Sequence, residues 1–98
     1  MIYSIIIKEQ AEKDLLRIKL YISYELNDPI NADKIIERII FQIENLSYFP
    51  NKYRIFSNDI RVCNLNSFSI YYTVENNNIY VLRILGNKQQ FNYFDIKN

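Results

Sequence analysis

The segment from Asp28 to Pro50, DPINADKIIERIIFQIENLSYFP, constrains the fold more than any other part of the chain. Asn27-Asp28-Pro29 interrupts a helical pattern, because the residue before a proline is pushed out of the helical region and asparagine tolerates a helix end. Apolar residues then recur at helical spacing until Phe49-Pro50 ends the second pattern. The segment therefore predicts the end of one amphipathic helix and nearly all of another.

Two helices are expected, one from about Glu9 to Leu26 and one that begins near Ile30. The connection between them is short, so the two helices should form an antiparallel hairpin. The apolar positions that would face the core are Ala11, Leu15, Ile18 and Ile22 on the first helix, and Ala32, Ile36, Ile39, Ile43 and Leu46 on the second.

Short apolar runs flank the helices and predict strands. Ile2 to Lys8 precedes the hairpin, and Asn51 to Asp59 after it has the composition of a loop. Three further strands are expected over Ile60 to Leu65, Phe68 to Glu75 and Ile79 to Leu85, separated by Asn66-Ser67 and Asn76-Asn77-Asn78. The predicted fold is α+β with the order β-α-α-β-β-β, an antiparallel sheet covered on one face by the N-terminal helix hairpin.

Alternation along the last two strands predicts which side chains face the helices. In the first of these strands the core set is Phe68, Ile70, Tyr72 and Val74. In the second, the core set is expected to be Tyr80, Leu82 and Ile84, which leaves Arg83 on the open face with Ile79, Val81 and Leu85.

Composition limits the chemistry that the chain can perform. Its 98 residues fit a single domain over residues 1–98, and no apolar run approaches the roughly 20 residues of a membrane span. Cys63 is the only cysteine and there is no histidine, so neither a disulfide framework nor a thiolate metal site is available, and the usual general base is missing. We expect a reduced cytoplasmic protein with no metal, no cofactor and no membrane association.

The net charge of +1 conceals an uneven distribution. Residues 1–50 carry six Lys and Arg against eight Asp and Glu, whereas residues 51–98 carry six against three. Binding to a phosphate backbone needs clustered Lys and Arg, and the second half offers a modest set. An RNA contact is therefore permitted but not required.

Several short motifs recur in an order that points to a known family. They are A-x-x-D-L from Ala11 to Leu15, Tyr21-Ile22, D-P-x-x-A from Asp28 to Ala32, I-x-x-L-x-x-F-P from Ile43 to Pro50, Arg61, F-x-I-Y-Y-x-V from Phe68 to Val74, and V-L-R-I-L from Val81 to Leu85. Together they resemble the RelE/ParE family of type II toxin-antitoxin toxins over nearly the whole chain. The resemblance implies a curved sheet under the helix hairpin, and a cytoplasmic toxin neutralised by an antitoxin encoded beside it.

Two activities occur in that family, and the chemistry of the chain bears on the choice. RelE-like members resemble ribosome-dependent endoribonucleases that cleave mRNA, whereas ParE-like members act on DNA gyrase without a known hydrolytic site. Cleavage at a 2′-OH needs a base, an acid and cations for the developing charge. Arg61 and Arg83 match the arginine positions of the family and could supply the cations.

The acid and base are harder to find. After V-L-R-I-L, nuclease members often carry His or Tyr followed by Arg, but this chain reads Gly86-Asn87-Lys88-Gln89-Gln90. Gly86 has no side chain, and glutamine does not transfer protons usefully at neutral pH. Tyr93 could substitute as proton donor, with Lys88 adding charge. We therefore favour inhibition of gyrase by binding, with the ribosome-dependent mRNA nuclease as the alternative, and with a decayed toxin that only binds its antitoxin as a third.

Candidate contact residues follow from these interpretations. A target or phosphate is expected to contact Arg61, Arg83 and Tyr71, since Tyr71 lies beside Arg83 on the proposed open face and could stack on a base or an antitoxin side chain. In the nuclease alternative the catalytic set is Arg61, Arg83, Lys88 and Tyr93.

A second apolar set lies away from the core stripe of each helix. At about 100° per residue, Leu16, Leu20 and Tyr24 fall near 140°, 180° and 220° from Ala11, and Phe41 falls about 180° from Ala32. Exposed apolar patches on small domains usually mark interfaces. We expect these four side chains to contact the antitoxin or a second protomer in a homodimer.

Overall fold

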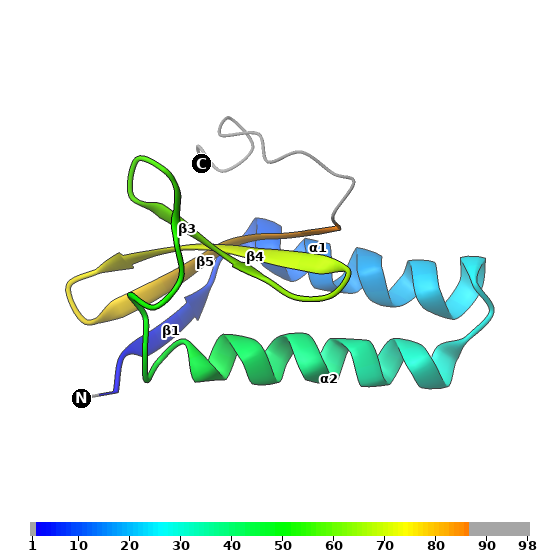
Figure 1. Cartoon of the computed structure of the whole chain (residues 1–98). Coiled ribbons are helices and arrows are strands. Elements are labelled where there is room, and N and C mark those ends of the chain that lie inside the picture. The colour runs from blue at the N-terminus through cyan, green and yellow to red at the C-terminus, as the bar shows by residue number, and fades with distance from the viewer. Residues whose placement is uncertain (1, 87–98) are drawn as a thin grey trace.

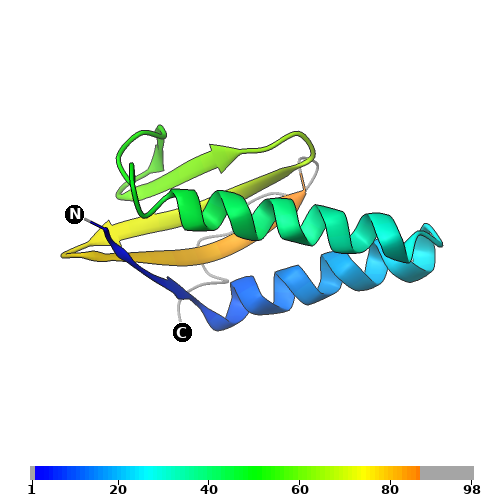
Figure 2. The same cartoon turned by 90° about the horizontal axis from the view of Figure 1, so that it is seen from below.

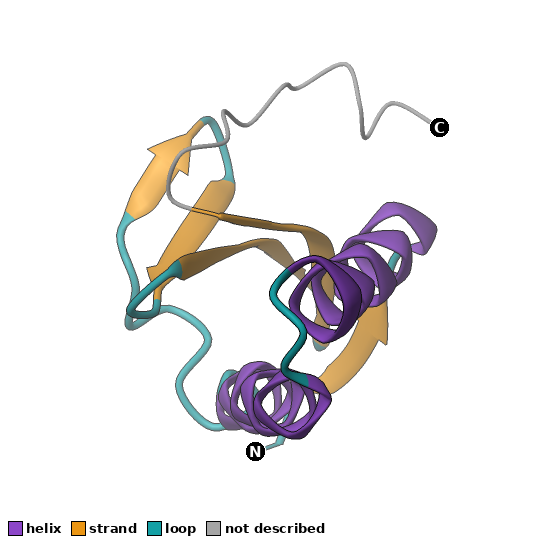
Figure 3. Cartoon of the chain, turned by 90° about the vertical axis from the view of Figure 1, so that its right-hand side faces the viewer, coloured by secondary structure: helices purple, strands orange, loops and turns teal. Residues whose placement is uncertain are grey.

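The computed structural model describes residues 2–86. Its elements in chain order are β1 (Ser4–Ile7), α1 (Glu9–Leu20), a π-helical turn η1 (Tyr21–Glu25), α2 (Pro29–Asn45), β2 (Ile55–Ser57), β3 (Ile60–Asn64), β4 (Phe68–Glu75) and β5 (Asn78–Gly86) (Figure 1). The two helices lie side by side against one face of the sheet, as the views from below and from the end show (Figures 2 and 3). The predicted α+β class and the helix hairpin that covers one face of the sheet are confirmed.

The sheet has five strands in the order β1-β5-β4-β3-β2, and two of its features differ from the prediction. β1 pairs with β5 in parallel, so the sheet is mixed and not wholly antiparallel. The segment Asn51 to Asp59, predicted as a loop, contains the three-residue edge strand β2, which pairs with β3. Both differences concern the edges of the sheet, where strand direction and short pairings depend on tertiary contacts that leave little trace in local sequence.

The hairpin connection has the local chemistry that the sequence predicts. Asn27 adopts a φ of 54°, the left-handed conformation that ends a helix. The side chain of Asp28 caps α2 by accepting a hydrogen bond from the Asn31 backbone N–H at 3.3 Å, and Pro29 occupies the first helical position. The predicted helix over Glu9 to Leu26 is present, but its last turn is the π-helical segment η1.

The main core lies between the helices and the sheet. The buried residues of this core cluster are Ala11, Ile18, Ile22, Ala32, Ile39, Ile43, Leu46, Cys63, Ile70, Tyr72, Ile79, Val81 and Ile84. The predicted helix stripes and the predicted inner face of β4 are confirmed. No helix among residues 2–86 is long and apolar enough to cross a membrane.

The prediction of which side chains face the helices is wrong for the first half of β5. β4 and β5 pair Tyr72 with Val81 but Tyr71 with Arg83, so Leu82 is the extra residue of a β-bulge. The bulge changes the phase of alternation, which places Ile79 and Val81 as well as Ile84 on the helix side. Tyr80 and Leu82 join a second apolar cluster on the other face with Ile60, Val62, Tyr71 and Leu85.

Candidate functional site

Arg83 forms a buried ion pair with Asp14 of α1. Arg83 Nε donates to Asp14 Oδ2 at 2.7 Å and Arg83 Nη2 donates to Asp14 Oδ1 at 2.9 Å, the two-pronged geometry that guanidinium and carboxylate groups favour. Asp14 is 0% exposed and Arg83 is 9% exposed. Arg83 is thus fixed by the fold, and only a small part of its surface can meet another molecule.

Asp14 also completes the hydrogen bonding of β5 beyond the end of β1. The pairing of β1 with β5 stops at Ile7 and Val81, and Lys8 N–H makes one more hydrogen bond to Val81 O before α1 begins. Further along β5, the Ile84 N–H donates to Asp14 Oδ2 at 2.9 Å. Beyond the end of β1, a side chain of α1 therefore provides the hydrogen-bond acceptor at this edge of β5. The Asp14 carboxylate satisfies a backbone N–H that would otherwise need a strand partner.

A second guanidinium shares the same carboxylate. Arg17 Nη1 donates to Asp14 Oδ1 at 2.9 Å, and the Arg17 side chain is about half exposed. Asp14 thus accepts four hydrogen bonds, which is the condition under which a buried carboxylate is tolerated. Asp14 was not among the site residues predicted from the sequence. The available signals were an acid inside the apolar stripe of the first helix and an arginine inside an apolar strand.

Arg61 has a different structural role, and its side chain is directed to the face of the sheet that the helices cover. It pairs in register with Tyr72, whose side chain faces the helices. Arg61 Nη1 donates to Tyr53 O at 2.7 Å and to Asn51 O at 3.3 Å. These contacts hold the segment that joins α2 to β2.

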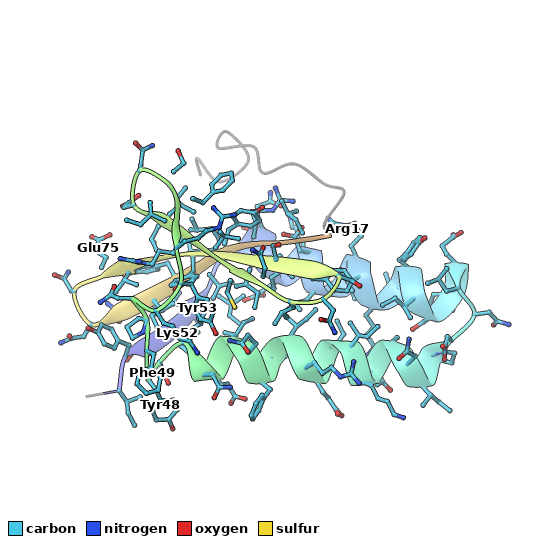
Figure 4. All side chains as sticks on the ribbon, viewed as in Figure 1. Arg17, Tyr48, Phe49, Lys52, Tyr53 and Glu75 are labelled. Atoms are coloured by element: carbon cyan, nitrogen blue, oxygen red, sulfur yellow. The ribbon has the colours of Figure 1, made fainter. Side chains whose placement is uncertain are left out.

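The same segment is held by Tyr72, whose hydroxyl donates to Pro50 O at 2.7 Å. This segment and the end of α2 form a groove, which is lined by Gln42, Asn45, Tyr48, Phe49, Lys52 and Tyr53. The last four of these residues are labelled near the end of α2 in Figure 4. Gln42 Nε2 donates to the Tyr53 hydroxyl at 2.8 Å. The groove is therefore built from a well-anchored loop and the last turns of a helix.

The strand register directs the two predicted arginines to different faces of the sheet. Arg61 lies on the helix side of the sheet by its register with Tyr72, whereas Arg83 pairs with Tyr71 on the opposite side. Tyr71 does lie beside Arg83, as predicted, but it is 9% exposed and its ring packs edge-on against Phe56 with centroids 5.1 Å apart. Lys88 and Tyr93 lie outside the described residues.

Three groups, two tyrosine hydroxyls and one thiol, have pKa values that are raised further above neutral pH. Burial raises the pKa of Tyr72 to about 12, although the nearby charge of Arg61 opposes the shift. Burial likewise raises the pKa of the Cys63 thiol and of Tyr53. These three groups stay protonated at physiological pH, so none of them can act as a general base there.

The predicted outward residues of α1 and η1 are exposed and line one groove. Leu16, Leu20 and Tyr24 are 57%, 44% and 77% exposed. They share a shallow groove of about 490 Å³ with Lys13, Arg17, Tyr21 and Glu25. Phe41 is also exposed, but it lines a separate groove with residues of α2 and Leu65. Among residues 2–86, no group of three or more His, Cys, Asp or Glu side chains could hold a metal ion.

Comparison with solved structures identifies the fold. A structure described as the chromosomal ParDE toxin-antitoxin system from P. aeruginosa is similar with a TM-score of 0.78 and 24% identity, over 87% of this chain and 96% of that chain. The crystal structure of the toxin-antitoxin complex RelBE2 from Mycobacterium tuberculosis is similar with a TM-score of 0.68 and 13% identity, over 89% of this chain and 100% of that chain. The chain therefore has a RelE/ParE-like fold.

The family follows from the sequence match. Residues 5–91 match the family model described as ParE toxin of type II toxin-antitoxin system, parDE. A search of curated proteins found no match. The chain belongs to the ParE toxin family of type II toxin-antitoxin systems.

Proposed function

We propose that this ParE-family toxin arrests growth by binding DNA gyrase, and that a cognate antitoxin blocks this binding. The observation that carries the proposal is the placement of Arg61 and Arg83. Both guanidinium groups hold parts of the fold together, and the strand register directs the two side chains to opposite faces of the sheet. RNA cleavage needs cations, acid and base to converge on one phosphate, whereas inhibition by binding needs only a stable surface.

The raised pKa values of Tyr53, Cys63 and Tyr72 favour the same mechanism. Each of these three groups keeps its proton at neutral pH, so none of the three can serve as a general base beside either arginine. Lys88 and Tyr93, the other members of the predicted nuclease set, lie outside residues 2–86. The nuclease alternative therefore depends on side chains whose positions the structure does not describe.

The contact with gyrase is proposed to include Arg61 and the surface around the Tyr71–Arg83 pair. Arg61 is partly exposed, so its guanidinium can make a charged contact while it holds the adjoining loop. Tyr71 and Arg83 are each 9% exposed, and they contribute chiefly by fixing the shape and charge of this part of the sheet. Such contacts are most effective where they are rigidly held before binding.

The antitoxin part of the proposal is supported by the family and by the relatives. One similar structure is described as a toxin-antitoxin complex and another as a toxin-antitoxin system. The exposed apolar side chains of both helices, including Phe41, are available for such a partner. We place both the toxin and its antitoxin in the cytoplasm, where gyrase acts.

A supercoiling assay with purified gyrase tests this function. The toxin should inhibit supercoiling of relaxed plasmid, and antitoxin added in equal amounts should restore it. A matched reaction contains translating ribosomes and mRNA in place of gyrase and plasmid. Cut mRNA with unimpaired supercoiling would replace gyrase binding with the nuclease mechanism, and inactivity of the folded toxin in both reactions would favour a decayed toxin.

A further inference from the structure

The outer groove of the first helix has the features of an interface with one particular partner. It runs along α1 and η1 and is lined by Lys13, Leu16, Arg17, Leu20, Tyr21, Tyr24 and Glu25. Leu16, Leu20, Tyr21 and Tyr24 are between 44% and 77% exposed, so four large apolar side chains meet water on one short stretch. Contiguous exposure of this kind on a small domain usually marks a surface that another protein covers.

The π-helical turn keeps this apolar row straight. In an α-helix, residues four apart drift by about 40° around the axis, because each residue turns about 100°. A π turn has more residues per turn and therefore turns less at each residue, which offsets that drift. η1 begins at Tyr21, between Leu20 and Tyr24. The turn thus brings Tyr24 back toward the line of Leu16 and Leu20.

The charges of the groove are arranged so that the surface complements itself. Its two basic residues, Lys13 and Arg17, lie in the first part of the row, and its acid, Glu25, lies at the far end. Leu20 stands midway between Leu16 and Tyr24. If two copies pair with antiparallel helices about Leu20, Leu16 faces Tyr24 of the second copy.

The same two-fold axis pairs the charges. Glu25 of the second copy then falls opposite position 15, midway between Lys13 and Arg17 along the helix. At a rise of about 1.5 Å per residue, each basic Cα lies about 3 Å along the axis from that point, well within the reach of a long side chain. A symmetric dimer requires a surface that is complementary to itself in this way.

We propose that the free toxin forms a two-fold symmetric homodimer through the outer face of α1 and η1, with antiparallel helices centred on Leu20. Leu20 contacts Leu20 of the second copy, Leu16 packs on Tyr24, and Glu25 lies between Lys13 and Arg17. The interface leaves the open face of the sheet and the groove beside Tyr53 free. The proposal concerns self-association, so it stands or falls independently of the gyrase target.

Sedimentation of the free toxin, separated from its antitoxin, tests the proposal. The toxin should sediment as a dimer that dissociates on dilution. Leu20→Glu places two carboxylates across the two-fold axis and should weaken the dimer at least about 100-fold. Phe41→Glu is the matched control, because Phe41 is 65% exposed and lines a different groove. A monomer at all concentrations, or equal effects of the two substitutions, would overturn the proposal.

Cross-linking tests the direction of the helices. A mixture of Leu16→Cys and Tyr24→Cys toxins, treated with a short bismaleimide, should give the mixed dimer in excess over either self-linked species. Cys63 is buried and remains as background. Preferential self-linking at each position would indicate parallel helices and contradict the model.

Two further experiments test the proposed charge pairing and distinguish a homodimer interface from an antitoxin site. Glu25→Lys should weaken the dimer, and adding Lys13→Glu should restore much of the lost affinity. If Leu20→Glu lowers affinity for the antitoxin while the unmodified free toxin is monomeric, the groove is an antitoxin site and the homodimer is refuted.

Discussion

Asp14 and Arg83 are 69 residues apart in the chain, yet they form a two-pronged buried ion pair that joins the first helix to the last described strand. The same carboxylate accepts the backbone N–H of Ile84 and a guanidinium hydrogen bond from Arg17. One side chain thus fixes the position of α1 against the end of β5. The arginine that the family resemblance implied as a contact residue is therefore also a structural element of the fold.

Removing the charge of Asp14 should destabilise the toxin strongly. Asp14→Asn leaves Arg83 buried without its counter-ion, and breaking a buried pair in this way costs about 3–5 kcal/mol in the free energy of unfolding. Urea unfolding measures the change. Glu12→Gln, on the exposed side of the same helix, is the matched control and should change stability by less than about 0.5 kcal/mol.

Replacing both partners separates the burial of charge from packing. In Asp14→Leu with Arg83→Met, no buried unpaired charge remains, because Arg17, which also loses its partner, is about half exposed. The Ile84 N–H loses its acceptor at a cost of about 1–3 kcal/mol, which is less than the cost of an unpaired buried guanidinium, so this double variant should be more stable than Asp14→Asn. Equal stability of Asp14→Asn and the unsubstituted toxin would show that the pair does not hold the fold. Loss of toxicity on Arg83→Ala is informative about gyrase only if the variant is shown to remain folded.

Arg61 should control the stability of the segment that follows α2. Arg61→Met removes the charged hydrogen bonds to Asn51 O and Tyr53 O, and we expect a loss of about 1.5–3 kcal/mol together with faster proteolysis between residues 51 and 59. Limited proteolysis followed by mass spectrometry locates the cuts. Arg54→Met is the control, since the Arg54 side chain is exposed on the same segment. Equal cleavage of both variants would refute the anchoring role.

Stability should fall at alkaline pH because of Tyr72. Its pKa is about 12 in the folded protein and about 10 when unfolded, so the folded state holds its proton more tightly. The contribution is fully present below about pH 10 and is lost as the pH rises from 10 toward 12, by an amount on the order of 2 kcal/mol.

Tyr72→Phe tests this pH dependence directly. The variant loses the hydrogen bond to Pro50 O, at a cost of about 1 kcal/mol at neutral pH, but its unfolding free energy should decline less between pH 10 and 12. Tyr24→Phe, at a side chain that is 77% exposed, should keep the slope of the unsubstituted toxin. An unchanged slope in Tyr72→Phe would mean that other groups cause the alkaline loss.

Local signals in the sequence were sufficient for the helices and for most of the core. The Asn27-Asp28-Pro29 break and the apolar spacing of both helices rest on backbone preferences and periodicity, which act over a few residues. The inner face of β4 followed from strict alternation. These features needed no knowledge of the tertiary structure.

The remaining features depend on contacts between distant segments. The bulge at Leu82 shifts the phase of β5, and a strand in which both faces are apolar gives no sign of such a shift. The parallel pairing of β1 and the short strand β2 depend on neighbours far along the chain. The role of Asp14 required pairing one unusual acid with one unusual arginine across 69 residues. The candidate arginines were identified from the sequence, but their placement on opposite sides of the sheet was not.

The mechanism of growth arrest is tested most directly by pulse labelling after controlled induction of the toxin without antitoxin. Thymidine and methionine incorporation are followed over the first minutes, with antitoxin co-expression as the control. Inhibition of gyrase predicts that thymidine incorporation falls first while methionine incorporation continues. An early fall in methionine incorporation with DNA synthesis intact would contradict gyrase inhibition and indicate mRNA cleavage.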